Sequence, residues 1–432
     1  MPVGFVGRRG AVFWLALKTG FWSILTLGFY RFWMKTRLRR YFWSSIRPGG
    51  HPMEYVGDPW EKLLGFFIAV VILTFYIGVV NLILMFVSFS LFDGNVAGYF
   101  LSFLGVIPLW FYARYRARRY VLGRTRWRGV RFGLEPGAWG YAWRACVHWL
   151  ITICTLGLLW PRMTFYLEKY RTDRTFFGSA KLTQGGRWTM LYRPAVPLIA
   201  ALVACGLWTL WVMVLQPVGP VLDLFVRGFL EGAFGMEIET GDQSRDPSNG
   251  NLSLTPPQAV WRMWLLIPLF GAVYFGVVHY IFGARRVMAN HKSSPGITFT
   301  SNLRTTRVAG IYAGGTTLAY LVLVFGILLI LLLMIPVVGF NILNQIGGID
   351  ADAIAGIPRW VSITASVILY FAVFLLWSVV YNTFVTFPLM RHMASTLSLP
   401  ENDGLTDISQ VARDEFAEAE GFAEALDLGA AI

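Results

Sequence analysis

The stretch AGIYAGGTTLAYLVLVFGILLILLLMIPV, residues 309–337, contains no charged residue. A helix needs about 20 apolar residues to cross the hydrocarbon core of a bilayer, so this stretch predicts a membrane span. Seven further apolar segments of comparable length lie at 11–33, 63–89, 97–113, 140–161, 194–216, 260–283 and 361–388. The chain is therefore predicted to be an all-α polytopic membrane protein.

The composition excludes the ordinary soluble class of protein. Apolar residues make up 56% of the 432 positions and charged residues 14%, which leaves too little polar surface to cover the chain in water. The net charge is +13, although the tail at 398–432 is strongly acidic. In a membrane protein, such an excess of positive charge normally lies in cytoplasmic loops, beside anionic headgroups. We therefore expect membrane lipids as partners and no nucleic acid.

The distribution of basic residues predicts how the segments cross the bilayer. Clusters of arginine and lysine fill the loops at 31–62, 114–139, 162–193 and 284–308. Only one apolar segment, 140–161, separates the second cluster from the third, so a full crossing there would place a basic loop outside. We expect 11–33 and 140–161 to be re-entrant or interfacial, and the other six segments to cross as three helical hairpins. Two ordinary kinked spans are the alternative.

An internal repeat leads to the same prediction. A shift of 129 residues superimposes ThrLeuGly at 26–28 on ThrLeuGly at 155–157, with six further identities around them and no gap. A glycine near the middle of each segment can break a helix into two arms that enter and leave on one side. Broken helices are tolerated in a bilayer where protein or water surrounds them. Gly28 and Gly157 are therefore the predicted break points.

The chain is predicted to contain four units. Residues 1–139 and 140–308 are the repeats, each with a re-entrant segment, a basic hairpin and two spans, and the second includes an outer loop at 217–259. Residues 309–397 form a final helical hairpin, and 398–432 an acidic tail. Both termini are expected in the cytoplasm, with the protein in a bacterial inner membrane. The tail is predicted to form an amphipathic helix that docks on the basic face or recruits a cytoplasmic protein; a disordered tail is the alternative.

Short strands are predicted where helices end in basic residues. An arginine pair, a short alternating stretch and a glycine-containing turn recur along the chain, which is typical of small β-hairpins. Four cytoplasmic hairpins are expected, with turns at 48–50, 128–129, 185–186 and 295–296. The paired arginines are candidates for contact with lipid headgroups: Arg39, Arg40, Arg118, Arg119, Arg285 and Arg286.

Few residues are candidates for catalysis or for binding a ligand. The chain has no GxxxxGK[ST], HExxH, GxSxG or CxxC motif, and its five histidines lack ligand spacing, so no metal or cofactor is expected and no enzyme activity is indicated. Lys18, Arg144 and His148 lie inside apolar segments, where a charge costs about 2.5 to 3.5 kcal/mol unless it pairs or lines a cavity. Arg144 and His148 share a helical face. These three residues are a candidate substrate-binding site; snorkelling of Lys18 and Arg144 to the headgroups is the alternative.

Several motifs together resemble a known family. They are LTLGFYRFWMKTRLRRYFW at 25–43, MEYVGDPWEKL at 53–63, YRARRYVLGRTRWRGVRFG at 115–133 and TLGLLWPRM at 155–163. These stretches are similar to bacterial inner-membrane proteins of the YjgN type, a family without an established biochemical function. The resemblance runs to about residue 395. It implies the location and the repeat architecture, and it supplies no catalytic residues.

Two functional hypotheses from different classes follow. The first, which the sequence favours, is a transporter or channel-like protein for a small anionic solute, because broken helices and polar residues build the binding sites of many transporters. The second is a structural or regulatory membrane protein whose cytoplasmic platform binds a protein partner or lipid. A membrane enzyme acting on lipids is a more distant third, because nucleophile and metal signatures are missing. The oligomeric state stays open.

Overall fold

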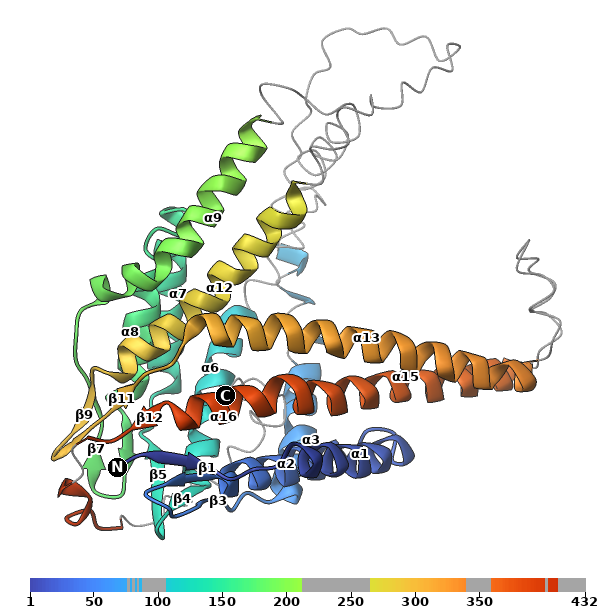
Figure 1. The fold of residues 1–432 in the computed structure, drawn as a ribbon, viewed down its shortest axis with the longest axis horizontal. Helices are drawn as coiled ribbons and strands as arrows, with labels where there is room; N and C mark the ends of the chain where they lie inside the picture. The colour runs from blue at the N-terminus through green and yellow to red at the C-terminus, as the bar shows by residue number, and fades with distance from the viewer. Residues whose placement is uncertain are drawn as a thin grey trace, which may run out of the picture.

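The computed structural model describes residues 1–75, 106–211, 265–338, 359–400 and 403–410, with a few positions between 78 and 87. Several predicted features lie partly or wholly outside these residues: most of the second half of the expected span at 63–89, the start of the span at 97–113, the outer loop and most of the acidic tail. The described chain is mainly helical, with short antiparallel strands gathered at one end of the molecule (Figure 1).

Four stretches are long and apolar enough to cross a membrane. They are Trp188–Leu210, Ile267–Ala289, Thr305–Leu329 and Phe371–Ser395. These stretches belong to the helices α9 (Tyr192–Leu210), α12 (Leu266–Ala289), α13 (Thr305–Val338) and α15 (Arg359–Tyr381), the last of which continues through a π-helical segment (Asn382–Thr386) into α16 (Phe387–Ser395). They correspond to four of the six expected spans. In Figure 1, α9 lies beside α12 and α13 beside α15, and the two pairs diverge from the end that carries the strands.

Both ThrLeuGly motifs end a helix, as predicted. Helix α1 (Arg9–Leu25) stops before the first motif and α2 (Arg31–Ser45) starts after it, and α7 (Ala138–Cys154) and α8 (Trp160–Thr172) flank the second motif in the same way. The glycines have φ of +93° at Gly28 and +83° at Gly157, a left-handed conformation that glycine adopts without strain. Both leucines before them have φ of +50°. The two turns thus share one geometry.

Strand pairing brings the two ends of each helical hairpin together. Before α1 lies β1 (Val3–Phe5), which pairs with β2 (Ile46–Pro48) directly after α2. Likewise β5 (Val130–Leu134) before α7 pairs with β6 (Thr175–Phe177) after α8. Each hairpin therefore leaves and returns at the same side of the molecule, whereas its depth in a bilayer stays a prediction.

The remaining strands complete a set of small sheets. A five-stranded sheet has the order β3-β4-β5-β6-β7, a three-stranded sheet the order β10-β9-β8, and β11 pairs with β12. The bounds not yet given are Met53–Tyr55 for β3, Thr125–Trp127 for β4, Ala180–Lys181 for β7, Thr183–Gln184 for β8, Lys292–Ser294 for β9, Ile297–Thr298 for β10, Thr300–Ser301 for β11 and Leu397–Ser398 for β12. The β5–β6 and β11–β12 pairings cross the expected borders between units.

Two of the four expected β-hairpins are present, and the predictions of the other two are wrong. The turns at 128–129 and 295–296 join β4 to β5 and β9 to β10. The strands on either side of 48–50 do not pair with each other, because β2 pairs with β1 and β3 with β4. After 185–186 the chain enters a short helical turn, η2 (Trp188–Leu191), and β8 pairs with β9 instead. Three-residue strands take the partners that tertiary packing offers, so a local turn signal is insufficient here.

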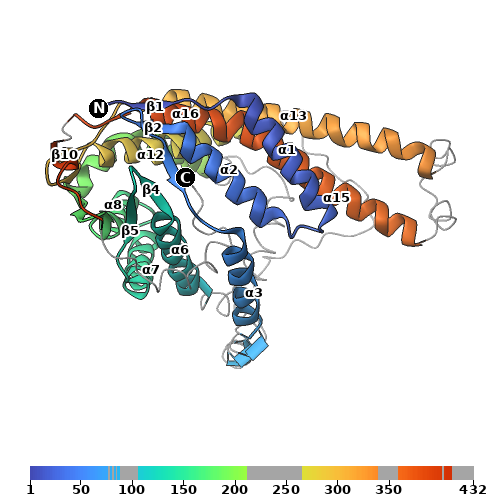
Figure 2. The same cartoon turned by 90° about the horizontal axis from the view of Figure 1, so that it is seen from below.

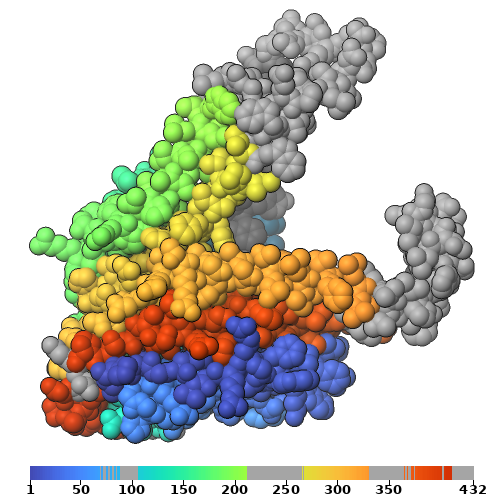
Figure 3. All heavy atoms as spheres, in the orientation of Figure 1, coloured from blue at the N-terminus to red at the C-terminus, as the bar shows by residue number. Residues whose placement is uncertain are grey.

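The helical hairpins pack on different helices. Val12 and Ala16 of α1 and Phe42 of α2 pack with Val379 and Phe387 of the helix from α15 to α16. Figure 2 shows α1 and α2 near α15, and α7 with α6 (Val106–Gly123) on another side of the molecule. In Figure 3 the first hairpin, the α15–α16 helix and α13 lie as successive layers. Exposed apolar side chains such as Leu321 and Phe325 line the outside of α13, where lipid can cover them.

Candidate functional site

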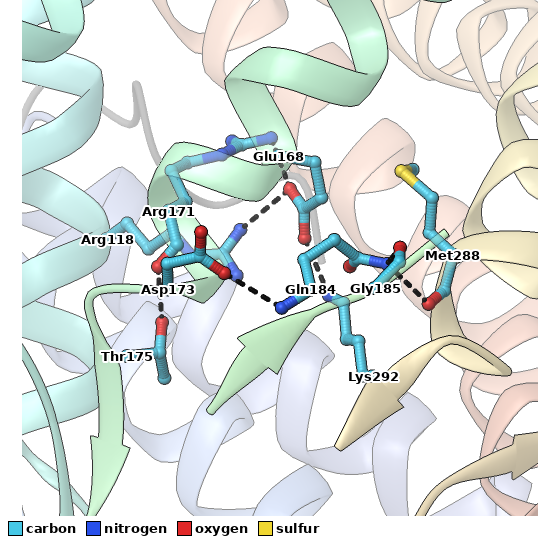
Figure 4. Close-up of polar contacts among 9 residues, drawn as sticks. All are labelled: Arg118, Glu168, Arg171, Asp173, Thr175, Gln184, Gly185, Met288 and Lys292. Carbon is cyan, nitrogen blue, oxygen red and sulfur yellow. Dashed lines mark hydrogen bonds and ion pairs between the residues drawn. The ribbon is translucent and has the colours of Figure 1, made fainter. Parts of the chain in front are cut away.

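A cluster of ion pairs centres on one carboxylate, Glu168 of α8. Arg171, one helical turn further on, donates from Nη2 to Glu168 Oε2 at 2.5 Å, and Lys292 of β9 donates from Nζ to Oε1 at 2.8 Å. Arg118 of α6 completes an ion pair, with its Nη1 3.7 Å from Oε2. Figure 4 shows these side chains converging from α6, α8 and β9. Glu168 is only 12% exposed, so the contact is largely shielded from water.

The charges around Glu168 do not cancel. Three cations contact the carboxylate, and Arg114 and Arg285 also act on it electrostatically. Burial by itself would raise the pKa of Glu168, but Lys292, Arg171 and Arg118 outweigh that effect and hold the pKa well below its usual 4.5. Burial lowers the pKa of the Arg118 guanidinium, and Glu168 opposes that change. The centre is therefore an ion-pair joint with an excess of positive charge.

A hydrogen-bonded glutamine fixes the strands beside this joint. The backbone N–H of Gln184 donates to Asp173 Oδ1 at 2.8 Å, and its side-chain amide donates to the carbonyl of Met288 at 3.1 Å. Lys169 Nζ donates to the Gln184 carbonyl at 2.8 Å. The C-terminal end of α12 is thereby tied to α8 and β8 (Figure 4). A second carboxylate, Glu61 of α3 (Pro59–Phe75), joins α3 to α6 by accepting hydrogen bonds from Arg124 and Tyr120.

The candidate substrate-binding residues fall into two separate places. Arg144 and His148 lie one turn apart on α7, as the sequence predicts. The Arg144 guanidinium donates to the Gly140 carbonyl at 3.0 Å and lies over the Tyr170 ring, and the His148 ring stacks on Tyr166 at 5.5 Å. Burial, with Arg162 and Arg144 adding to it, lowers the pKa of His148 below its usual 6.5.

Lys18 is not brought to Arg144. It is exposed on α1, and α1 packs against α15, whereas α7 packs against α6. Arg144 is also exposed. The structure therefore assembles no single pocket from all three candidate residues in the part of the chain it describes.

The six paired arginines divide by exposure. Arg39 and Arg119 are buried, and the guanidinium of Arg39 lies over the rings of Tyr55 and Trp43. Arg118 and Arg285 are half-buried at the Glu168 joint. Arg40 and Arg286 are exposed; Arg40 donates to the Gly57 carbonyl at 2.8 Å and Arg286 to the Leu303 carbonyl at 3.4 Å. Several of these side chains hold helix ends to neighbouring loops and strands, a role that the sequence pattern did not reveal.

The tips of the helical hairpins expose leucine. Leu27 is 67% exposed and Leu156 98% exposed, and both have positive φ. Exposed apolar neighbours on α7 and in its turn, including Trp143, Ile153 and Leu158, extend the apolar surface. A leucine at φ of +50° is strained by roughly 1 to 2 kcal/mol, and its exposure in water adds no compensating burial. Such tips are therefore candidates for contact with hydrocarbon.

The described residues contain no cluster of side chains suited to a metal ion. Within the described ranges no group of three or more histidine, cysteine, aspartate or glutamate side chains is placed to hold a metal ion. The three cysteines are unpaired, and Cys154 is exposed. Ion-pair joints and apolar tips thus dominate the features that could carry function.

Comparison with known protein families gives one match. Residues 1–335 match a family described as "Bacterial protein of unknown function (DUF898)". The chain belongs to this family. It is the family of the YjgN proteins, so the resemblance found in the sequence is confirmed. Neither the curated proteins nor the solved structures contain a match to the chain. The DUF898 assignment thus supports a bacterial protein with several apolar helices and supplies no activity.

Proposed function

We propose that this DUF898 protein is a multi-pass protein of the bacterial inner membrane that binds anionic lipids of the cytoplasmic leaflet. Two helical hairpins insert their leucine tips into that leaflet, and the basic end of the molecule contacts its headgroups. The function is structural or regulatory and needs no catalytic group. Under this proposal the lipid itself is the principal ligand.

The exposed leucine tips carry this proposal. In water, Leu156 has an unfavourable exposure and a strained backbone; in hydrocarbon, the same surface becomes favourable, by roughly 25 cal/mol per Å² removed from water. Helix α1 with 17 residues and α8 with 13 are about 25 and 20 Å long, less than the roughly 30 Å of the hydrocarbon core. Because both ends of each hairpin lie at the strand end, such arms fit insertion into one side of a bilayer.

The charge of the strand end supports the same conclusion. Exposed basic residues there include Arg40, Arg47, Arg128, Arg187 and Arg286. Near an anionic leaflet each lysine or arginine contributes about 1 kcal/mol of attraction, and the effect decays within a Debye length. The paired residues Arg40 and Arg286, rather than the buried Arg39 and Arg119, are the members of the arginine pairs available for this contact.

Lipid-dependent thermal stability tests the proposal. The full chain, purified in a neutral detergent, should gain more in melting temperature from phosphatidylglycerol than from phosphatidylcholine with the same acyl chains. High salt should reduce the difference, because exposed charges are screened. Equal gains from the two lipids at low salt would overturn the preference for anionic headgroups.

Transport of a small anionic solute is the second candidate, and the observation that favours it is the Arg144 and His148 face of α7. A cation stacked on Tyr170 can attract an anion toward the hairpin. Under this hypothesis Arg144→Ala abolishes solute uptake into proteoliposomes with normal protein yield, and Lys18→Ala resembles it. Under snorkelling, Arg144→Lys is silent and Arg144→Ala changes only insertion or yield.

A further inference from the structure

An arginine-lined cleft lies where α13 begins and α16 ends, apart from the Glu168 joint and the hairpin tips. Two adjoining cavities, of about 430 and 390 Å³, share Arg307, His392 and Ser395 as lining residues. The first also includes Arg304, and the second Arg9 and Arg391. We call this combined feature the arginine cleft. Cavities of this size are in the range of small-molecule sites.

The cleft carries positive charge without a carboxylate. Four guanidinium groups line it, and no aspartate or glutamate is among the described lining residues. The Arg9 guanidinium lies over the Phe384 ring at 5.7 Å. Within the described chain, the side chains of Arg304, Arg307 and Arg391 make no ion pair or hydrogen bond.

Polar groups around the arginines suit a phosphate group. Asn302, Thr396 and Ser398 line the first cavity beside Arg304. The free backbone N–H groups in the first turn of α13, which starts at Thr305, add the positive end of a helix dipole. A guanidinium offers planar donors that match phosphate oxygens, and hydrogen bonds to charged groups are worth about 1.5 to 3 kcal/mol each.

One buried histidine helps to shape the cleft. His392 is 6% exposed, and its Nε2 accepts a hydrogen bond from the backbone N–H of Arg304 at 3.4 Å. This contact requires the ring to be neutral, with its proton on Nδ1. It joins α16 to the start of α13 and so fixes the spacing of Arg391 and Arg307.

We propose that the arginine cleft binds a phosphate group carrying two negative charges, as in a phosphate monoester. The group can come from a lipid such as phosphatidic acid or from a soluble phosphate. The cleft lies at the ends of the apolar stretches Thr305–Leu329 and Phe371–Ser395, where headgroups meet the hydrocarbon, so a lipid source is geometrically accessible. The site goes beyond the proposed general attraction to anionic lipid and does not depend on insertion of the hairpin tips.

The test uses the full chain in neutral detergent at constant ionic strength. Inorganic phosphate and mixed micelles with phosphatidic acid are the two probes, and chloride and phosphatidylcholine are their references; binding is followed by calorimetry and by melting temperature. The variant is the double substitution Arg307→Gln and Arg391→Gln. Both side chains are exposed and make no described hydrogen bond or ion pair, so the fold should survive. The control is Arg37→Gln, which replaces an exposed arginine of α2 that does not line the cleft.

At least one probe should bind, and the double variant should weaken that binding at least tenfold, which is about 1.4 kcal/mol, while Arg37→Gln leaves it unchanged. Binding of phosphate alone would assign a soluble ligand, and binding of phosphatidic acid alone a lipid headgroup; both support the cleft. Absence of binding by both probes, or an equal loss in variant and control, would overturn it. A preference for phosphatidylglycerol that survives in the double variant would show that the general lipid attraction stands without this site.

Discussion

Glu168 illustrates what a single residue contributes to this molecule. Its carboxylate holds together a helix that starts at Trp160, a helix that ends at Gly123 and a strand near residue 292. Removing one partner of a buried ion pair leaves an uncompensated charge, which typically lowers the free energy of unfolding by about 3 to 5 kcal/mol. Because Glu168 keeps some contact with water, the lower end of this range, about 3 kcal/mol, applies here. The joint is therefore expected to be a main determinant of how α6, α8 and β9 stay together.

Glu168→Gln should lower the free energy of unfolding by about 3 kcal/mol, because Arg118, Arg171 and Lys292 are left to repel one another. The measurement is the melting temperature in detergent. Glu135→Gln is the matched control: Glu135 pairs with Lys181 at 2.7 Å, but both side chains are about half exposed, so the change should be within about 1 kcal/mol. Equal effects of the two substitutions would contradict the role of the buried joint.

The contribution of Glu168 to the free energy of unfolding should be lost only at low pH. The pKa of Glu168 is held well below 4.5 in the folded protein, so its contribution is present above 4.5 and is lost as the pH falls through the folded value. The difference in melting temperature between the native protein and Glu168→Gln should thus be constant from pH 7 to about 5 and should shrink at lower pH. A difference that already disappears near pH 6 would be inconsistent with this ion pair.

Single residues were predictable from the sequence only where their partners are local. Arg144 and His148 share a face because helix geometry places positions four apart together, and the structure agrees. The sequence did not indicate the ion pairs of Glu168, because Lys292 is 124 positions away and becomes a neighbour only when β8 pairs with β9. The arginine cleft was missed for the same reason: its arginines come from the N-terminus, α13 and α16.

At the level of elements, the helical hairpins were predictable and the strand pairs only in part. The ThrLeuGly turn is specified locally, because the residue after leucine must adopt positive φ and glycine does so freely. The expected β-hairpin at 48–50 failed because its two short strands find better partners in β1 and β4. Apolar length was sufficient to predict the four helices that are long and apolar enough to cross a membrane, since a 20-residue apolar helix needs no long-range information.

Gly28→Ala should lower the free energy of unfolding by about 1 kcal/mol, because an L-residue at φ of +93° is strained. Space does not explain the effect: the nearest atom to an added methyl group is a Phe371 ring carbon at 3.7 Å, an ordinary contact. Gly10→Ala, in the first turn of α1 with nothing within 4 Å, is the control and should be neutral or slightly stabilising. A loss of stability in Gly10→Ala alone would refute this explanation.

At the scale of the whole molecule, one end combines strands, ion pairs and exposed arginines, and apolar helices diverge from it (Figure 1). The two hairpins extend from this same end, because their strands pair at its sheets. This arrangement fits a protein that sits on one leaflet through its basic end and enters that leaflet with its hairpin tips. The central claim of the proposal is therefore the position of Leu156 and Leu27 in hydrocarbon.

The most direct test measures the depth of Leu156 with a nitroxide label. The label is placed by Leu156→Cys in full-length protein whose Cys146, Cys154 and Cys205 are replaced by alanine, after reconstitution into bilayers of phosphatidylethanolamine and phosphatidylglycerol. A label at Arg128→Cys, in the exposed β4–β5 turn, is the control. We predict that the Leu156 label is accessible to oxygen, which dissolves in hydrocarbon, and protected from a water-soluble nickel chelate, with the reverse at Arg128. Equal accessibility of both labels to the nickel chelate would contradict insertion of the tip.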